Sequence, residues 1–477
     1  LGWCYHKMRP QNDKEIVHAW SESLRAGGPA GQAAGLYLGQ FQLTLDAQFA
    51  PQAVGFWQRA LDKVARPEQF RNDFVTLKEV VEILEDAMQR VGHEPEQAQA
   101  VAELYRRVTK GGVADERIGH AAEARAKALA EDLKNSIPGV TAEQVQVHYR
   151  RAGEAYQNAA RVSTPAERMD LLWRSIKCYL EGKETLTAQK LLLDFVKEET
   201  REAPLSEAWF TLGDLYVGES KKEDAHKALV KCLQYPDTPF AYRARYLLAS
   251  AEIDRGNLKE AVHILDQILR GNPDIDRAAH EKALYRMASL FLTMKDYPKA
   301  REYLTHCLNV YPDNPNAHLT RQQLGDCFRQ LAARDAQLET ETRDKIRADL
   351  PEELRLPLEE KSRNHRKDKL GNLQEANKNY QALHDQLDAI ARDKPLDKMQ
   401  QTLLRRAGFG IGDCLLDGED FLTALKEFRK VQLRHRGSLE SLYACTRICF
   451  AVDAMRPTGR DGVQLKEQAM ESLTVLL

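Results

Sequence analysis

Apolar residues recur every three or four positions along almost the whole chain, which is the spacing of amphipathic helices. No segment alternates between apolar and polar residues for long enough to require a sheet. The clearest regularity lies between residues 206 and 316, where one pattern occurs three times. Each copy has a small residue after an apolar one, an alanine twelve residues later, then a large apolar residue, and a proline at its end.

This pattern predicts helix hairpins that stack on one another. The small residue of the first helix lets the second helix approach closely, and the alanine fills the same crossing point. We expect the large apolar residue to pack on the next hairpin, because one hairpin cannot bury its apolar face alone. The proline ends each unit, since it lacks the amide hydrogen needed to continue a helix. The structural repeat positions are Leu212, Gly213, Ala225, Ala249, Ala261, Ala288 and Ala300, with Gly412 and Ala424 in a later copy.

Weaker copies extend the array in both directions. Leu324-Gly325 opens a unit whose second helix, marked by Ala376, comes about forty residues late, so we expect a charged helical insertion at about 333–370. The predicted organisation is degenerate N-terminal hairpins over 1–67 (one of them starting at Leu1-Gly2), atypical hairpins over 68–203, the best copies over 204–316, a split unit and a further unit over 317–437, and a terminal helix pair over 438–477.

One copy carries Trp209, Leu212, Gly213, Tyr216, Ala225 and Pro236 in the pattern W-x2-L-G-x2-Y … A … P. Through these residues the chain resembles the tetratricopeptide repeat family, and the next two copies match with substitutions at the Trp and Tyr positions. The resemblance implies an all-α fold, a right-handed α-solenoid of stacked antiparallel helix hairpins. It also implies that the first helices line a concave surface that binds proteins. The junction Tyr311–Ala317 is similar to those of bacterial envelope repeat proteins.

Composition narrows the functional classes. The 477 residues include 69 basic and 71 acidic side chains, a formal net charge of −2, which argues against a nucleic-acid-binding protein. A hydrophobic fraction of 43% with a mean hydropathy of −0.54 suits many amphipathic helices. No apolar run is long enough for a transmembrane segment. The chain starts at Leu1 without a signal peptide, and we expect both ends to be cuts through a longer polypeptide.

The motifs do not indicate catalysis. Gly408-Phe-Gly-Ile-Gly412 would suit a nucleotide only between a strand and a helix, and here it lies where a first helix is expected. The 13 histidines are unclustered, the eight cysteines form no CxxC pair, and neither HExxH nor GxSxG occurs. We predict no enzyme, no cofactor and no metal site. Basic residues between Lys361 and Lys369 are either a patch for phosphates or an acidic partner, or part of an exposed, self-neutralising helical extension.

The predicted groove is the most informative surface. First helices carry an aromatic residue at one equivalent position and a small polar residue four positions later, on the same face. The peptide-groove candidates are Phe210, Asp214, Tyr246, Ser250, Tyr285, Ser289, Phe409 and Asp413. Pointing inward, they would suit an extended peptide or an amphipathic helix; the alternative is that the rings pack on the neighbouring hairpin. Family members that grip a terminal carboxylate use Lys and Asn here, and this sequence lacks them.

These observations predict a non-catalytic scaffold that binds one or more proteins. Two alternatives remain open: a structural component of a membrane-coat or bacterial envelope assembly, and an accessory helical domain of a larger multidomain protein. The sequence does not distinguish a cytoplasmic location from a periplasmic or envelope-associated one.

Overall fold

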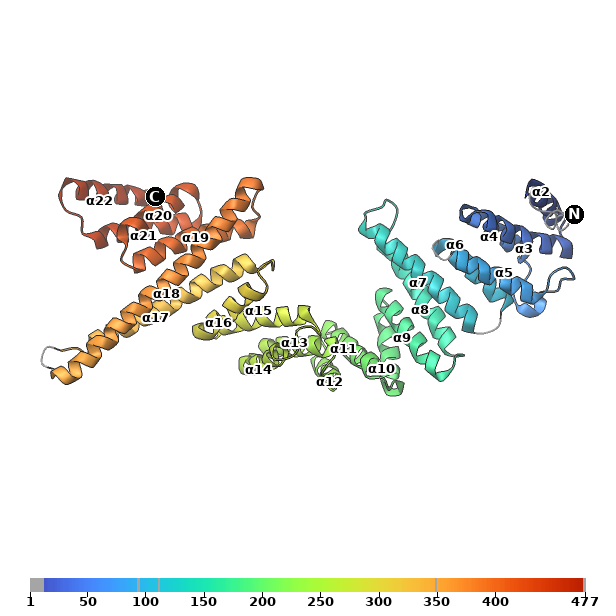
Figure 1. Cartoon of the computed structure of the whole chain (residues 1–477), viewed down its shortest axis with the longest axis horizontal. Helices are drawn as coiled ribbons and strands as arrows, with labels where there is room; N and C mark the ends of the chain where they lie inside the picture. The colour runs from blue at the N-terminus through green and yellow to red at the C-terminus, as the bar shows by residue number, and fades with distance from the viewer. Residues whose placement is uncertain (1–12, 92–94, 110–111, 348–349, 475–477) are drawn as a thin grey trace. The chain divides into compact units, whose positions relative to one another are not determined.

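The computed structural model of the chain describes residues 13–91, 95–109, 112–347 and 350–474. Within these residues the chain forms 21 α-helices, two short 3-10 helices and no strand. It divides into two compact units, Leu1–Tyr235 and Pro236–Leu477. Each unit is a stack of antiparallel helix hairpins (Figure 1), so the predicted all-α solenoid fold is confirmed. The start of the hairpin predicted at Leu1-Gly2 lies outside the described residues.

Successive helices of the N-terminal unit pack pairwise on one another. Its helices are α2 (Asp13–Ala26), α3 (Gly28–Leu45), α4 (Ala50–Ala60), α5 (Leu77–Arg90), α6 (Pro95–Val108), α7 (Gly112–Lys134), α8 (Ala142–Ala160), α9 (Pro165–Glu181), α10 (Thr185–Glu198), α11 (Glu202–Gly218) and α12 (Lys222–Cys232). The helices predicted within the atypical region correspond to α6, α7, α8 and α9.

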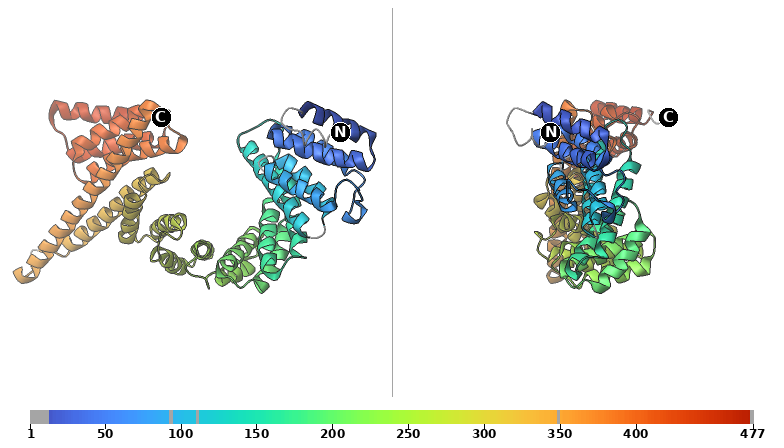
Figure 2. Two further views of the ribbon diagram at one scale, coloured as in Figure 1. Left: turned by 45° about the vertical axis from the view of Figure 1, so that its right-hand side comes forward. Right: turned by 90° about the vertical axis from the view of Figure 1, so that its right-hand side faces the viewer.

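The C-terminal unit continues the same architecture. Its helices are α13 (Pro239–Asp254), α14 (Leu258–Leu269), α15 (Arg277–Thr293), α16 (Tyr297–Val310), α17 (Ala317–Arg343), α18 (Glu352–Asp393), α19 (Lys398–Asp417), α20 (Phe421–Arg434), α21 (Leu439–Met455) and α22 (Gly459–Thr474). The helices α17 and α18 are 27 and 42 residues long and extend together beyond their neighbours as a two-helix arm (Figures 1 and 2). The residues 333–370 occupy the extended parts of these two helices.

The turn inside five of the hairpins uses a residue with left-handed backbone. The φ angles are 60° at Lys183, 60° at Ser220, 81° at Gly256, 58° at Lys295 and 70° at Glu419. These residues follow the last turn of a first helix and stand one position before the N-cap of the second helix. Only one of the five is glycine, so four hairpins accept the steric cost of a side chain at positive φ.

A large side chain of the second helix covers a small residue of the first in each hairpin. A Cβ atom placed on Gly213 would lie 2.6 Å from Leu229 Cδ2, and one on Gly412 would lie 2.6 Å from Phe428 Cε1. Leu229 and Phe428 thus pack within their own hairpins. Phe428 also belongs to an apolar cluster with Ala444 and Ile448 of α21, in the next hairpin, as the sequence predicted for this position. All nine predicted structural repeat positions are buried, namely Leu212, Gly213, Ala225, Ala249, Ala261, Ala288, Ala300, Gly412 and Ala424.

The atypical N-terminal region uses the same contact. A Cβ on Gly119 of α7 would lie 2.7 Å from the ring of Tyr156 on α8, and a Cβ on Gly153 of α8 would lie 3.1 Å from the Tyr179 ring of α9. Tyr156 is completely buried. In these hairpins the number of residues between the small residue and the ring differs from that of the repeat, but a large side chain still covers a small residue.

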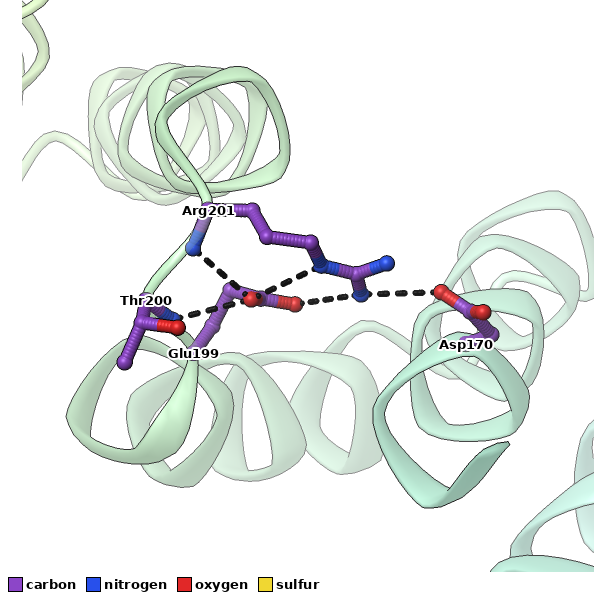
Figure 3. Close-up of polar contacts among 4 residues, drawn as sticks. All are labelled: Asp170, Glu199, Thr200 and Arg201. Carbon is purple, nitrogen blue, oxygen red and sulfur yellow. Dashed lines mark hydrogen bonds and ion pairs between the residues drawn. The ribbon is translucent and has the colours of Figure 1, made fainter. Parts of the chain in front are cut away.

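A buried carboxylate fixes the junction between α10 and α11 (Figure 3). The Glu199 carboxylate accepts hydrogen bonds from the backbone amides of Thr200 and Arg201, each at 2.9 Å, and from the Arg201 guanidinium at 2.7 and 3.0 Å. The same guanidinium donates to Asp170 on α9 at 2.8 Å. The hydrogen bonds from the Arg201 side chain and from the two backbone amides lower the pKa of Glu199 to about 2, although burial alone would raise it. The junction thus ties three consecutive helices together.

We predict that Glu199→Gln destabilises the N-terminal unit in a pH-dependent way. The folded pKa of about 2 lies below the ordinary value of 4.5, so the stabilisation is complete above pH 4.5 and disappears as the pH falls towards 2. The shift corresponds to roughly 3 kcal/mol. Urea unfolding should show a difference between wild type and variant that shrinks from about pH 5 to about pH 3. The exposed neighbour change Glu198→Gln should show a much smaller difference; equal losses from both would contradict the assignment.

A second prediction tests the hairpin crossing with two glycines of α11. Gly213→Ala should lower the free energy of unfolding by about 1–3 kcal/mol, because the new methyl group overlaps Leu229. A Cβ on Gly218 meets nothing within 4 Å, so Gly218→Ala should be neutral or stabilising by up to about 1 kcal/mol. Thermal unfolding of both variants measures the difference, and a neutral Gly213→Ala would disprove the close contact.

Candidate functional site on the first helices of the C-terminal unit

The eight predicted groove residues are divided between the two units. Phe210 and Asp214 lie on α11 of the N-terminal unit, and the other six lie on α13, α15 and α19 of the C-terminal unit. Their exposure differs widely: Asp214 and Ser289 are exposed, Phe210, Tyr246, Ser250, Tyr285 and Phe409 are half-buried, and Asp413 is buried. The six residues of the C-terminal unit can be compared with one another.

The aromatic residues of this set pack partly against their own unit. The Phe409 ring lies 5.5 Å from the Phe428 ring of α20 and 6.4 Å from the Tyr443 ring of α21. The Tyr285 hydroxyl donates a hydrogen bond of 3.4 Å to the Tyr311 carbonyl, and burial raises the pKa of Tyr285 to about 12. Tyr246 contacts the apolar core that α13 to α17 share. These rings therefore contribute to packing within the unit, and the contacts of Phe409 with Phe428 and of Tyr285 with Tyr311 lie within their own hairpins, not on the neighbouring one.

Asp413 links three first helices through two arginines. Its carboxylate lies 2.8 Å from Arg329 Nη2 of α17 and 3.0 Å from Arg447 Nε of α21, and only 3% of the residue is exposed. Burial raises the pKa of Asp413, and the two guanidinium groups oppose that rise. Arg329 also lies 3.5 Å from the more exposed Asp417. Asp413 is thus not a free groove carboxylate; its charge is used to join α17, α19 and α21.

The unit that opens at Leu324-Gly325 has polar residues at both of the positions that define the groove candidates. Gln322 and Asp326 stand three residues before and one residue after Gly325, the same offsets that Phe409 and Asp413 have from Gly412. Asp326 Oδ1 accepts hydrogen bonds from the Tyr380 hydroxyl at 2.5 Å and from Gln322 Nε2 at 3.3 Å. Our sequence analysis did not include these two residues, although the offset from Gly325 was a sufficient signal for both.

Exposed apolar side chains form a stripe on α21. Leu439, Tyr443 and Phe450 are 61%, 54% and 61% exposed, and their spacing places them on one face with Arg447 between the two aromatic residues. We name the surface formed by Arg329, Phe409, Asp413, Tyr443, Arg447 and Phe450 the α17–α19–α21 face. The sequence analysis missed this stripe, because α21 carries the small residue Cys449, not glycine or alanine, at the crossing with α22, where Cys449 Sγ lies 3.2 Å from the Ala469 carbonyl.

A family model described as "Tetratricopeptide repeat" matches residues 282–314, which cover most of α15 and α16. This match falls on the hairpin where Ala288, Ala300 and Leu304 are buried as the repeat requires. Residues 282–314 therefore form a tetratricopeptide repeat. No curated protein matches the sequence.

Several solved structures of tetratricopeptide repeat proteins are similar at low identity. The C-terminal part of a repeat-containing protein from Cytophaga hutchinsonii is 14% identical with a TM-score of 0.35, and the match covers 71% of this chain and 98% of that one. Yeast Tom70 is 12% identical with a TM-score of 0.28, covering 92% and 99%. A signal-transduction ATPase with a tetratricopeptide repeat sensor from Pyrococcus horikoshii is 14% identical with a TM-score of 0.30, covering 84% and 53%. At these TM-scores the matches carry no argument about partners.

Tetratricopeptide repeats indicate a protein-interaction scaffold, and the family is generally non-catalytic. In the part of the chain that the structure describes, no group of three or more His, Cys, Asp or Glu side chains is arranged to hold a metal ion. Likewise, none of the described helices has the length and apolar character needed to cross a membrane. The glycines of the GFGIG segment lie inside α19, where Gly410 and Gly412 face Tyr380 and Phe428.

We predict that Asp413→Asn destabilises the C-terminal unit by about 3 kcal/mol, because two arginines then lose the charge of their shared buried partner. Asp417 provides the control on the same helix: its side chain is 48% exposed, and Asp417→Asn should cost less than about 1 kcal/mol. Urea unfolding gives both values, and hydrogen exchange should accelerate in α19 and α21 of the Asp413 variant only. Equal effects would show that the Asp413 ion pairs do not hold these helices.

Proposed function

We propose that this protein is a scaffold whose α17–α19–α21 face binds an amphipathic helix of a partner protein. Tyr443 and Phe450 serve as the apolar anchors in this proposal, and Phe409 forms the bottom of the contact. The groove candidates on α13 and α15 (Tyr246, Ser250, Tyr285 and Ser289) extend the same binding surface. The proposed role in a coat or envelope assembly stays a prediction from the sequence.

The observation that carries the proposal is the exposure of two aromatic side chains on a first helix. Large aromatic residues that protrude beside an arginine are typical of interface anchors. The spacing of Leu439, Tyr443 and Phe450 presents an apolar row along one helix face, which matches the apolar stripe of a second helix. The exposed Arg406 lies at the edge of this row, 3.9 Å from Glu440, and can pair with an acidic residue at the polar border of the partner helix.

The test is a selection of helical peptides from a library on the intact chain, followed by affinity measurements on variants. Tyr443→Ala and Phe450→Ala should each weaken the selected peptides about 5- to 30-fold, as truncation of an interface anchor costs about 1–2 kcal/mol. Because both side chains are more than half exposed, the variants should unfold at the wild-type temperature.

Met470 on α22 gives the matched control, since it is 62% exposed and lies on the second helix of the same hairpin. Met470→Ala should leave the affinity unchanged. Peptides that bind equally to all three variants would contradict the assignment of the face. A photo-crosslinking residue at position 443 should then also fail to label the peptide.

A further inference from the structure

A second polar site lies on the N-terminal unit, between its first helices α7 and α9. A cavity of about 600 Å3 is lined by His120, Glu123 and Lys127 of α7, Tyr149 of α8, and Arg174, Lys177 and Glu181 of α9, together with Ala124 and Cys178. Three cationic side chains and two carboxylates thus face one space. The cavity belongs to neither the repeat packing nor the α17–α19–α21 face.

One of the two carboxylates, Glu123, already has partners within the protein. Glu123 accepts a hydrogen bond of 2.8 Å from the buried Tyr156 hydroxyl at one oxygen, and its other oxygen lies 2.5 Å from Lys127 Nζ. The small residue at Gly119 allows the Tyr156 ring to occupy this position. Glu123 and Lys127 therefore form an ion pair on the α7 side of the cavity, and Glu123 interacts with the Arg174 charge only at longer range.

The α9 side presents two cations, Arg174 and Lys177, and one carboxylate, Glu181, which forms no ion pair with either of them among the described residues. Arg174 Nη1 lies 3.1 Å from His120 Nε2 and 3.3 Å from His120 Nδ1, and among the described residues Arg174 forms no ion pair with a carboxylate. Burial and the nearby Arg174 lower the pKa of His120, so a second positive charge beside the guanidinium is disfavoured. Lys177 is exposed, and its Nζ lies 5.5 Å from the centre of the Trp173 ring.

We propose that the α7–α9 cavity binds an oxyanion, a carboxylate or a phosphate group, on a side chain of a partner peptide. Arg174 supplies a planar pair of donors that fits either group, Lys177 supplies a second positive charge, and the Tyr149 hydroxyl supplies a neutral donor. The cavity is larger than the anion alone, so it accommodates the side chain that carries it. That the anion belongs to a partner protein rests on the proposed protein-binding function. That the cavity binds an anion at all does not depend on that function.

The experiment compares three short fluorescent peptides that differ only in one central residue: phosphoserine, glutamate or serine. Fluorescence anisotropy with the intact chain should show binding of the two anionic peptides and none of the serine peptide. Tighter binding of the phosphoserine peptide identifies phosphate as the ligand, and equal affinity identifies a carboxylate as sufficient. Affinity should fall as salt is raised, because the contact is between exposed charges.

Arg174→Gln and Lys177→Gln should each weaken the anionic peptides by roughly 5- to 20-fold, the loss expected for one charge-assisted hydrogen bond. Lys190→Gln on α10 removes an equally exposed charge outside the cavity and should change nothing. Circular dichroism confirms that the variants fold. An equal loss from Lys190→Gln, or no binding by either anionic peptide, would overturn the site.

Two further measurements distinguish a peptide-borne anion from free phosphate, and this site from the α17–α19–α21 face. Inorganic phosphate should compete with the anionic peptides. Direct binding of inorganic phosphate, measured by calorimetry, with no binding of either anionic peptide would overturn the peptide origin of the ligand. The Tyr443→Ala variant should bind the anionic peptides as wild type does, because its site lies in the other unit. Loss of anionic-peptide binding in that variant would overturn the independence of the two sites.

Discussion

The contact between a small residue of one helix and a large side chain of the next is the constraint on which the whole chain depends. Gly213 under Leu229, Gly412 under Phe428 and Gly119 under Tyr156 bring paired helices so close that even a methyl group would overlap the neighbour. A helix pair held at this distance buries a continuous apolar seam, and each seam is covered by the following helix. The chain therefore has a series of small cores along each unit and no single centre.

Where the spacing is regular, the sequence predicted the small residue at the helix crossing, but it assigned alanine, and not the large side chain, as the partner of that residue. From Gly213 to Leu229 and from Gly412 to Phe428 the separation is the same, because a short turn joins helices of ordinary length. Around Gly119 the first helix is longer and the loop before α8 is different, so Tyr156 comes much later in the sequence, and the pair was not recognised. Gly325 and Tyr380 are still farther apart because of the α17–α18 arm, but Ala376 marked the second helix there.

The side chains of the first helices were harder to predict than the packing positions. The offset from the small residue predicted Asp413 as a groove residue, but offsets within one repeat contain no information about Arg329 and Arg447, which pair with it from two other repeats. Asp413 pairs with these arginines because a carboxylate that is removed from water requires compensating cations, and the repeats before and after supply them. The sequence therefore identifies the charged residues, but it does not show which repeats their ion pairs connect.

On the α17–α19–α21 face, neighbouring side chains thus have different roles: some stabilise the helix stack and others are available for binding. Asp413 is buried and holds three helices, whereas Tyr443 and Phe450 on the next helix are mostly exposed and contribute little to the stack. Stacking uses the seams between consecutive helices, so a side chain that projects away from every seam is not constrained by the fold. The same reasoning applies to Arg174 and Lys177, whose charges no carboxylate of the described chain neutralises by direct ion pairing. In a solenoid, where most polar groups of an inward face are paired with adjacent repeats, the unpaired cations and the exposed rings are the groups left to recognise another molecule.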